Sequence, residues 1–86
     1  MNFIHSRKQL NKGDVVELTC DSVCNFMLTD DQNFSSYKNG DVFGYYGGHF
    51  TDFPARITTP HSGEWNIIID APSGEPIGSY RMKVIS

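Results

Sequence analysis

The sequence feature that most constrains the fold is a series of short runs in which apolar and polar residues alternate. Alternate side chains of a β-strand point to opposite faces of a sheet, so such runs are typical of strands with one buried face. No segment places apolar residues at the spacing of a long amphipathic helix. The pattern therefore predicts an all-β chain. The clearest runs are residues 14–20, 24–29, 53–59, 64–70 and 79–85.

Two weaker runs bring the expected number of strands to about seven or eight, which is typical of a small β-sandwich. They are residues 2–5 and the aromatic-rich residues 41–46. We expect Gly47 and Gly48 to end the second run, because glycine has no side chain to pack in a strand. The predicted fold is a small antiparallel β-sandwich, jelly-roll-like, in which two sheets pack face to face.

The polar stretch 30–40 is predicted to be a structured loop with at most one short helical turn. Phe34 and Tyr37 lie three residues apart, a spacing that places both on one face of such a turn. Asp31 or Asn33 has the short polar side chain that caps the first turn of a helix.

The length and charge of the chain narrow the class of protein. Its 86 residues suffice for one domain, residues 1–86. The net charge is -3 and the seven Lys and Arg residues are scattered, which argues against a nucleic-acid partner. No apolar run reaches the roughly 18 residues of a membrane span, and the N-terminus lacks the pattern of a signal peptide. We expect a cytoplasmic protein that binds neither nucleic acid nor membrane.

Cys20 and Cys24 bracket three residues, the length of a short hairpin loop. In the cytoplasm both thiols are expected to be reduced. A structural zinc site needs a tetrahedral set of ligands, and no histidine lies at a paired ligand spacing. We therefore interpret the cysteines as small apolar core residues. Metal or redox use, including pairing of the two thiols, stays open as the alternative.

Residues 43–50 are the least ordinary part of the chain, with four aromatic residues, three glycines and a histidine. Exposed aromatic side chains flanked by polar groups are typical of binding surfaces, although alternate aromatic residues of a strand equally fill a core. Arg56 is expected to point away from the core, where a guanidinium can bind a carboxylate or phosphate. The predicted ligand- or partner-binding residues are Asn33, Tyr45, Tyr46, His49, Arg56 and His61.

A small hydrolase or metal-dependent enzyme would depend on His49, Asp52 and His61. Such catalysis needs an activated nucleophile or a metal beside the imidazole, and the chain has no Gly-x-Ser-x-Gly motif. We therefore predict no catalytic residue, no metal ligand and no cofactor.

Five motifs of the chain are collectively specific. They are Cys-Asn-Phe-Met-Leu at 24–28, Asp-Asp-Gln-Asn-Phe-Ser-Ser-Tyr at 30–37, Tyr-Gly-Gly-His at 46–49, Phe-Pro-Ala-Arg-Ile at 53–57 and Pro-His-Ser-Gly-Glu-Trp-Asn at 60–66. Through them the sequence resembles a family of small bacterial proteins catalogued as domain of unknown function 1883. The resemblance implies a compact β-sandwich. It also implies a recognition role, because similar domains are sometimes joined to a Toll/interleukin-1-receptor-like domain.

The leading functional hypothesis is a non-enzymatic binding or interaction module whose partner is a protein or a small polar ligand. The first alternative is the small hydrolase. The second is a structural subunit that forms a homodimer through its sheet edges, since a small sandwich exposes edge strands.

Overall fold

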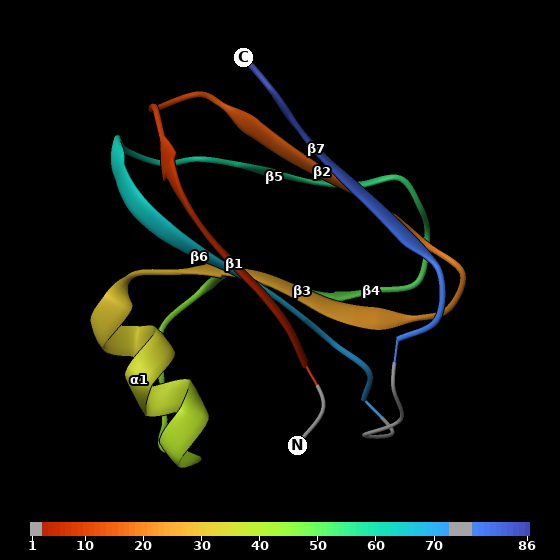
Figure 1. The fold of residues 1–86 in the computed structure, drawn as a ribbon, viewed down its shortest axis with the longest axis horizontal. Helices are drawn as coiled ribbons and strands as arrows, with labels where there is room; N and C mark the ends of the chain where they lie inside the picture. Colours follow the sequence, from red (N-terminus) through yellow and green to blue (C-terminus); the bar gives the residue numbers. More distant parts are fainter. Residues whose placement is uncertain (1–2, 73–76) are drawn as a thin grey trace.

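Two antiparallel β-sheets pack face to face in the computed structural model, which describes residues 3–72 and 77–86 (Figure 1). The all-β sandwich predicted from the alternation is confirmed, with seven strands in the described residues. The helix, at nine residues, is longer than the single turn expected. In chain order the elements are β1 (Phe3–Leu10), β2 (Val15–Cys20), β3 (Cys24–Thr29), α1 (Asp31–Asn39), β4 (Tyr46–Phe50), β5 (Ala55–Thr58), β6 (Gly63–Asp70) and β7 (Tyr80–Ile85).

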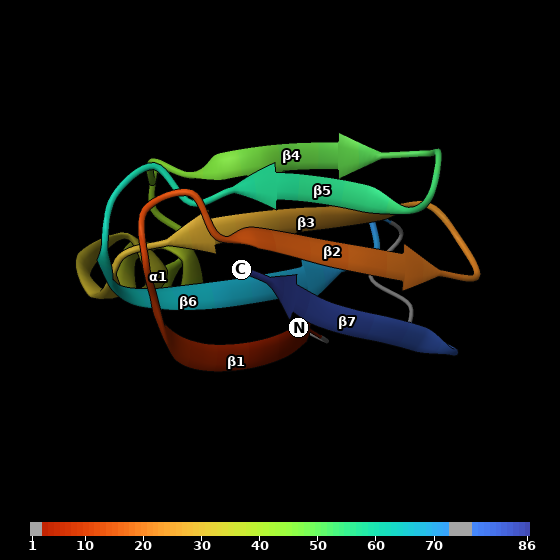
Figure 2. The same cartoon turned by 90° about the horizontal axis from the view of Figure 1, so that it is seen from above.

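The larger sheet has the strand order β1-β6-β3-β4, and the smaller sheet has the order β5-β2-β7. Figure 2 shows the smaller sheet lying over the larger one. Within the described residues, the chain changes sheets at every connection except the one from β3 to β4, and that connection contains α1. The loop of residues 21–23 therefore links the two sheets, and the expected hairpin at this point is wrong.

The core between the sheets is built from the residues that the alternation places on one face of each run. Burial of an apolar side chain of this size contributes roughly 1.5–3 kcal/mol relative to exposure, so this layer is the main source of stability. Its large buried members include Val16, Leu18, Phe26, Leu28, Trp65, Ile67 and Ile69.

The last strand departs from its expected burial. The alternation in residues 79–85 predicts that Tyr80, Met82 and Val84 face inward. Met82 packs against the core, but Tyr80 and Val84 are 45% and 36% exposed. The reason is that β7 is an edge strand that pairs only with β2, so its side chains have strand neighbours on one side.

The strand β4 runs through Gly47 and Gly48, so the predicted strand that ends at these glycines is wrong. Residues 41–45 are irregular instead. Gly47 has a φ of 108°, and a Cβ at this position would collide with the Phe26 carbonyl oxygen and the Ile57 side chain. Glycine is therefore required here by the close approach of the neighbouring strands rather than by a turn.

Residues of the polar stretch 30–40 form α1, and local signals define both of its ends. The N-cap is Asp30, whose carboxylate accepts a hydrogen bond of 2.7 Å from the Asn33 backbone N–H. The expectation that Asp31 or Asn33 is the cap is wrong. Gly40 follows the helix in the left-handed conformation, with φ 78°, which is the common glycine ending of a helix.

The helix lies against the outer face of the larger sheet (Figure 1). A second apolar cluster forms between them, so Phe34 and Tyr37 do share a face as their spacing predicts. Its buried members are Met27, Tyr37 and Ile68, with Phe3, Phe34 and Phe43 packed against them.

Candidate binding site

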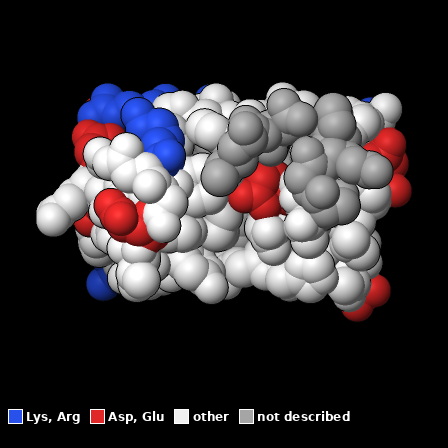
Figure 3. All heavy atoms as spheres, turned by 90° about the horizontal axis from the view of Figure 1, so that it is seen from below, with Lys and Arg blue, Asp and Glu red and all other residues white. Residues whose placement is uncertain are grey.

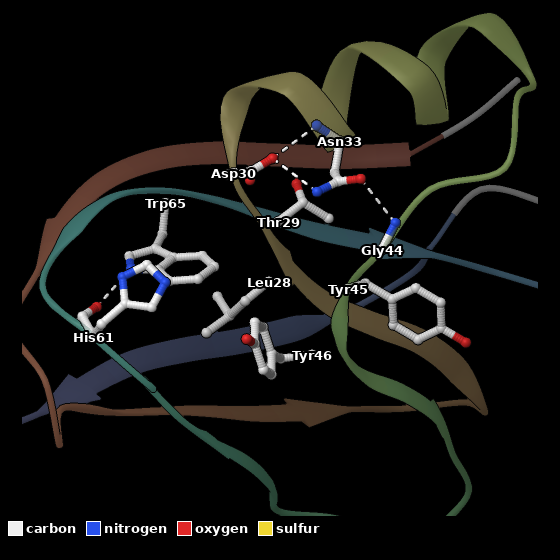
Figure 4. Close-up of a pocket in the computed structure, with 9 residues that line it drawn as sticks. All are labelled: Leu28, Thr29, Asp30, Asn33, Gly44, Tyr45, Tyr46, His61 and Trp65. Atoms are coloured by element: carbon white, nitrogen blue, oxygen red, sulfur yellow. Dashed lines mark hydrogen bonds between the residues drawn. The ribbon is translucent and has the colours of Figure 1, made fainter.

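Predicted site residues concentrate in a pocket of about 360 Å³ where β3 leads into α1 (Figure 4). We call it the end pocket. Its residues come from the end of β3, the first turn of α1, the approach to β4, and the β5–β6 connection with the first part of β6. It is lined by Leu28, Thr29, Asp30, Asn33, Gly44, Tyr45, Tyr46, His61 and Trp65.

The side-chain amide of Asn33 holds the polar side of the end pocket together. Its Nδ2 donates a hydrogen bond to Asp30 Oδ1 at 2.9 Å, and its Oδ1 accepts one from the Gly44 backbone N–H at 2.8 Å. The amide thus joins the beginning of α1 to the irregular segment before β4 (Figure 4). Because Tyr45 and Tyr46 directly follow Gly44, this link positions both tyrosines at the pocket.

The Thr29 hydroxyl is a buried polar group on the same side. Thr29 is 1% exposed, and its Oγ1 has no hydrogen-bond partner among the described residues. An unsatisfied buried hydroxyl costs about 1–3 kcal/mol. In Figure 4 the side chain lies beside the Asn33 amide and the Asp30 carboxylate. A polar ligand atom that reached the Thr29 hydroxyl would therefore be stabilised by a new hydrogen bond.

Aromatic rings form the other side of the end pocket. The rings of Tyr46 and Trp65 meet edge to face with centroids 5.8 Å apart, and the His61 ring lies 4.9 Å from Trp65. The indole Nε1 donates to the His61 carbonyl at 3.1 Å, which fixes the ring. Trp65 is 2% exposed, whereas Tyr45 and Tyr46 are 50% and 47% exposed. Tyr46 is thus the accessible ring of this wall, whereas the Tyr45 ring points away from it (Figure 4).

The fold brings together Asn33, Tyr45, Tyr46 and His61, four of the six predicted binding residues. His49 lines a second pocket, also of about 360 Å³, on the helix-bearing face of the larger sheet. We call this the face pocket. Tyr45 lines both pockets, but its ring points away from the Tyr46, Trp65 and His61 side chains (Figure 4) and lies 5.3 Å from the Phe43 ring of the face pocket.

Arg56 lies apart from both pockets. It points away from the core, as its strand position predicts, and its Nε donates to Glu17 Oε2 at 2.8 Å. Lys83 Nζ lies 3.5 Å from the other oxygen of the same carboxylate. The hydrogen bond from Arg56 is the main cause that lowers the pKa of Glu17. The guanidinium is therefore already paired with a carboxylate of this chain.

The residues of the hydrolase alternative are not gathered in one pocket. His61 lines the end pocket, His49 lines the face pocket, and Asp52 borders neither. Across residues 3–72 and 77–86, no group of three or more His, Cys, Asp or Glu side chains is placed to hold a metal ion.

Both cysteines are free thiols. Cys24 is fully buried in the core between the sheets, and burial raises the pKa of its thiol to about 12. The core role predicted for Cys24 is confirmed, while Cys20 is half-buried and packs against the same cluster.

Sequence reasoning missed Thr29, Asp30 and Trp65 as pocket residues. A readable signal existed for Asp30, because Asp directly before a helical segment is a common N-cap. The alternation in residues 64–70 predicts only that Trp65 is a core residue, which it is. Its place in the lining of the end pocket depends on contacts with His61 and Tyr46. Thr29 continues the alternation of its strand, and nothing local marks it as a pocket residue.

The fold and its pockets define a small two-sheet β-sandwich that carries one helix on the outer face of the larger sheet. The chain belongs to the family described as domain of unknown function DUF1883, whose model matches residues 1–86. Comparison of the chain with the curated proteins and with the solved structures finds no match. In the part of the chain that the structure describes, no helix has the length and apolar character needed to cross a membrane.

Proposed function

We propose that this chain is a non-enzymatic binding module whose end pocket takes a small polar ligand, either free or displayed by a partner protein. The observation that carries the proposal is the convergence of Asn33, Tyr46 and His61, from distant parts of the sequence, on one pocket. Small-ligand sites typically combine aromatic walls with a few fixed polar groups, and the end pocket has both.

The lining favours an uncharged ligand that carries hydroxyl or amide groups. Thr29 offers a hydroxyl without a partner, and Asp30 offers a carboxylate. The exposed ring of Tyr46 offers an apolar face. The described lining residues include no Lys or Arg, so an anion would meet Asp30 without a counter-charge. A sugar ring combines hydroxyl groups with apolar faces and is the ligand class that fits best.

The test is an NMR titration of ¹⁵N-labelled protein with three neutral probes: glucose, N-acetylglucosamine and N-methylacetamide. We expect at least one sugar to shift the backbone amides of Asn33, Gly44 and Tyr46. Trp65 is the single tryptophan of the chain, so its fluorescence gives a second readout. If none of the probes shifts these amides at high millimolar concentration, the proposed ligand class is wrong.

A pair of variants tests the site. Tyr46→Ala removes an accessible ring and is expected to weaken binding about tenfold, in line with the loss of an aromatic contact. Arg56→Ala is the matched control, because it also truncates an exposed side chain but lies outside both pockets. Binding should be unchanged in this control. If Tyr46→Ala unfolds the protein, Tyr46 is a core residue and the assignment fails.

A homo-oligomeric subunit remains the competing hypothesis, and the charges of the sheet edges argue against it. Strands β1, β5 and β7 are edge strands and carry Lys or Arg, which disfavour edge-to-edge pairing. Strand β4 is an uncharged edge, so it is the edge through which a dimer would form. Light scattering at several concentrations separates the two ideas. A stable dimer that is disrupted by His49→Lys would support the oligomeric role.

A further inference from the structure

The face pocket contains a chain of hydrogen bonds that has no role in the end pocket. Asn25 Nδ2 donates to Asp70 Oδ1 at 2.7 Å, and the Tyr37 hydroxyl donates to Asp70 Oδ2 at 2.5 Å. His49 Nδ1 lies 3.3 Å from Asn25 Oδ1. The four residues belong to β3, β6, α1 and β4, and they meet on the outer face of the larger sheet.

The carboxylate of Asp70 determines which group donates and which accepts in the hydrogen bonds of Asn25. An ionised carboxylate only accepts hydrogen bonds, so the Asn25 atom at Asp70 is the NH₂ group and the atom at His49 is the oxygen. His49 Nδ1 must therefore carry the proton when its imidazole is neutral. The lone pair of Nε2 is then left as an acceptor with no hydrogen bond from the described residues.

The charge of the face pocket is negative. Asp70 receives hydrogen bonds from two neutral donors, and the described lining residues include no Lys or Arg. Figure 3 views this face: the charged atoms drawn in its middle are acidic, and the basic atoms gather mostly toward one end. A cation that entered the pocket would meet a carboxylate and an imidazole acceptor, without a competing Lys or Arg among the described lining residues.

Aromatic rings form the remaining wall of the face pocket. The Phe43 ring meets Tyr37 edge to face with centroids 5.2 Å apart, and it lies 5.3 Å from the Tyr45 ring. Gly48 adds no side chain, and a Cβ there would stand 3.9 Å from the Tyr45 ring. The face of an aromatic ring attracts cations through its electron-rich π system. The rings therefore favour a positively charged ligand, as the carboxylate of Asp70 does.

We propose that the face pocket binds an alkylammonium group, with Asp70 as the counter-charge and His49 Nε2 as a hydrogen-bond acceptor. The alkyl chain packs along Phe43 and Tyr45. The group can come from a lysine side chain of a partner protein or from a free amine. The inference is independent of the end pocket, with which it shares Tyr45 alone.

The probe is n-butylammonium chloride, and its uncharged counterpart is n-butanol. In ¹⁵N-labelled protein we expect the ammonium to shift the amides of Asn25, His49 and Asp70, with roughly millimolar affinity for a ligand of this size. Butanol should shift them far less at the same concentration. If both probes bind equally, the pocket is merely apolar and the proposal is wrong.

Two substitutions test the proposed contacts. Asp70→Asn removes the charge while keeping the shape, and we expect butylammonium to bind at least tenfold more weakly. His49→Ala removes the acceptor from an exposed position and should weaken binding several-fold, so it tests the site even if Asp70→Asn fails to fold. Asp41→Asn changes the net charge equally but lies outside the pocket. An equal loss of affinity in Asp41→Asn would show nonspecific attraction and overturn the proposal.

The source of the group is distinguished with two further probes. Nα-acetyl-lysine methylamide presents the ammonium as a protein does, and cadaverine presents it as a free diamine. Tighter binding of the lysine derivative indicates a partner protein, and tighter binding of cadaverine indicates a free amine. Failure of both to shift the amides of Asn25 and Asp70 would contradict the proposal.

Discussion

The hydroxyl of Tyr37 donates a hydrogen bond of 2.5 Å to the carboxylate of Asp70, and this bond joins α1 to the last residue of β6. Burial and this carboxylate both raise the pKa of Tyr37, burial being the larger cause. The contact positions the helix on the sheet, and the helix contributes residues to both pockets.

Tyr37→Phe is expected to lower the free energy of unfolding by about 1.5–3 kcal/mol, the range for a hydrogen bond to a charged group. Because the pKa of Tyr37 is raised in the folded state, its contribution is fully present below about pH 10, the ordinary pKa of tyrosine, and is lost as pH rises above it. Urea denaturation at neutral and alkaline pH checks both effects. An equal alkaline loss of stability in wild type and Tyr37→Phe would contradict this assignment.

Gly47→Ala is expected to be much more damaging than Gly13→Ala. Both glycines have positive φ, which costs a residue with a Cβ about 1–3 kcal/mol. A Cβ at Gly47 would also collide with the Phe26 carbonyl oxygen, whereas one at Gly13 would meet nothing within 4 Å. Thermal denaturation of the two variants gives the comparison. Equal losses of stability would mean that the neighbouring strands do not approach Gly47 closely.

Asn33→Ala is expected to loosen the approach to β4 while leaving the helix cap in place. The variant removes the acceptor of the Gly44 N–H, but Asp30 still accepts from the backbone N–H of residue 33. Hydrogen exchange of the Gly44 amide should accelerate, and sugar binding in the end pocket should weaken several-fold. Unchanged exchange at Gly44 would show that the amide of Asn33 does not hold this segment.

Asp31 is expected to make the protein sensitive to acid. The Arg7 guanidinium, which hydrogen bonds to its carboxylate, is the main cause that lowers the pKa of Asp31, and Asn66 adds a further bond. The folded state therefore keeps this carboxylate ionised at a pH where the unfolded chain binds a proton. Its contribution is present above about pH 4 and is lost as pH falls further. Denaturation experiments between about pH 5 and pH 2 should show that the free energy of unfolding depends less on pH in Asp31→Asn than in wild type. Identical pH profiles would contradict the pairing.

Strand identity and buried faces could be predicted wherever the signal is local. In residues 24–29 and 64–70 the apolar period of two is enough to place Phe26 and Ile67 in the core, because side-chain direction in a strand is set by the strand itself. The alternation fails at β7, where Tyr80 and Val84 have the right period but lie on an edge strand. The same sequence pattern is compatible with a central or an edge position.

The helix α1 could be predicted from the sequence only in part. Asp30 and Gly40 are local start and stop signals for α1, and Phe34 and Tyr37 mark its buried face. The stretch between them is polar, and an isolated helix of this length is marginal in water. Packing on Met27 and Ile68 supplies the missing stabilisation, so the full length of the helix follows from a contact with distant strands.

The sequence by itself determined that this is an all-β sandwich and which faces of its clearest strands are buried. It also gave the candidate binding residues, all of which lie between residues 33 and 61. Tertiary structure decided how those residues are grouped. Asn33, Tyr46 and His61 meet because β4 pairs with β3 and the chain crosses between sheets before β6. Arg56 lies on the smaller sheet, because the chain crosses to that sheet between β4 and β5. Sites of this kind depend on which strands become neighbours, and that choice is made by long-range pairing and burial rather than by local periodicity.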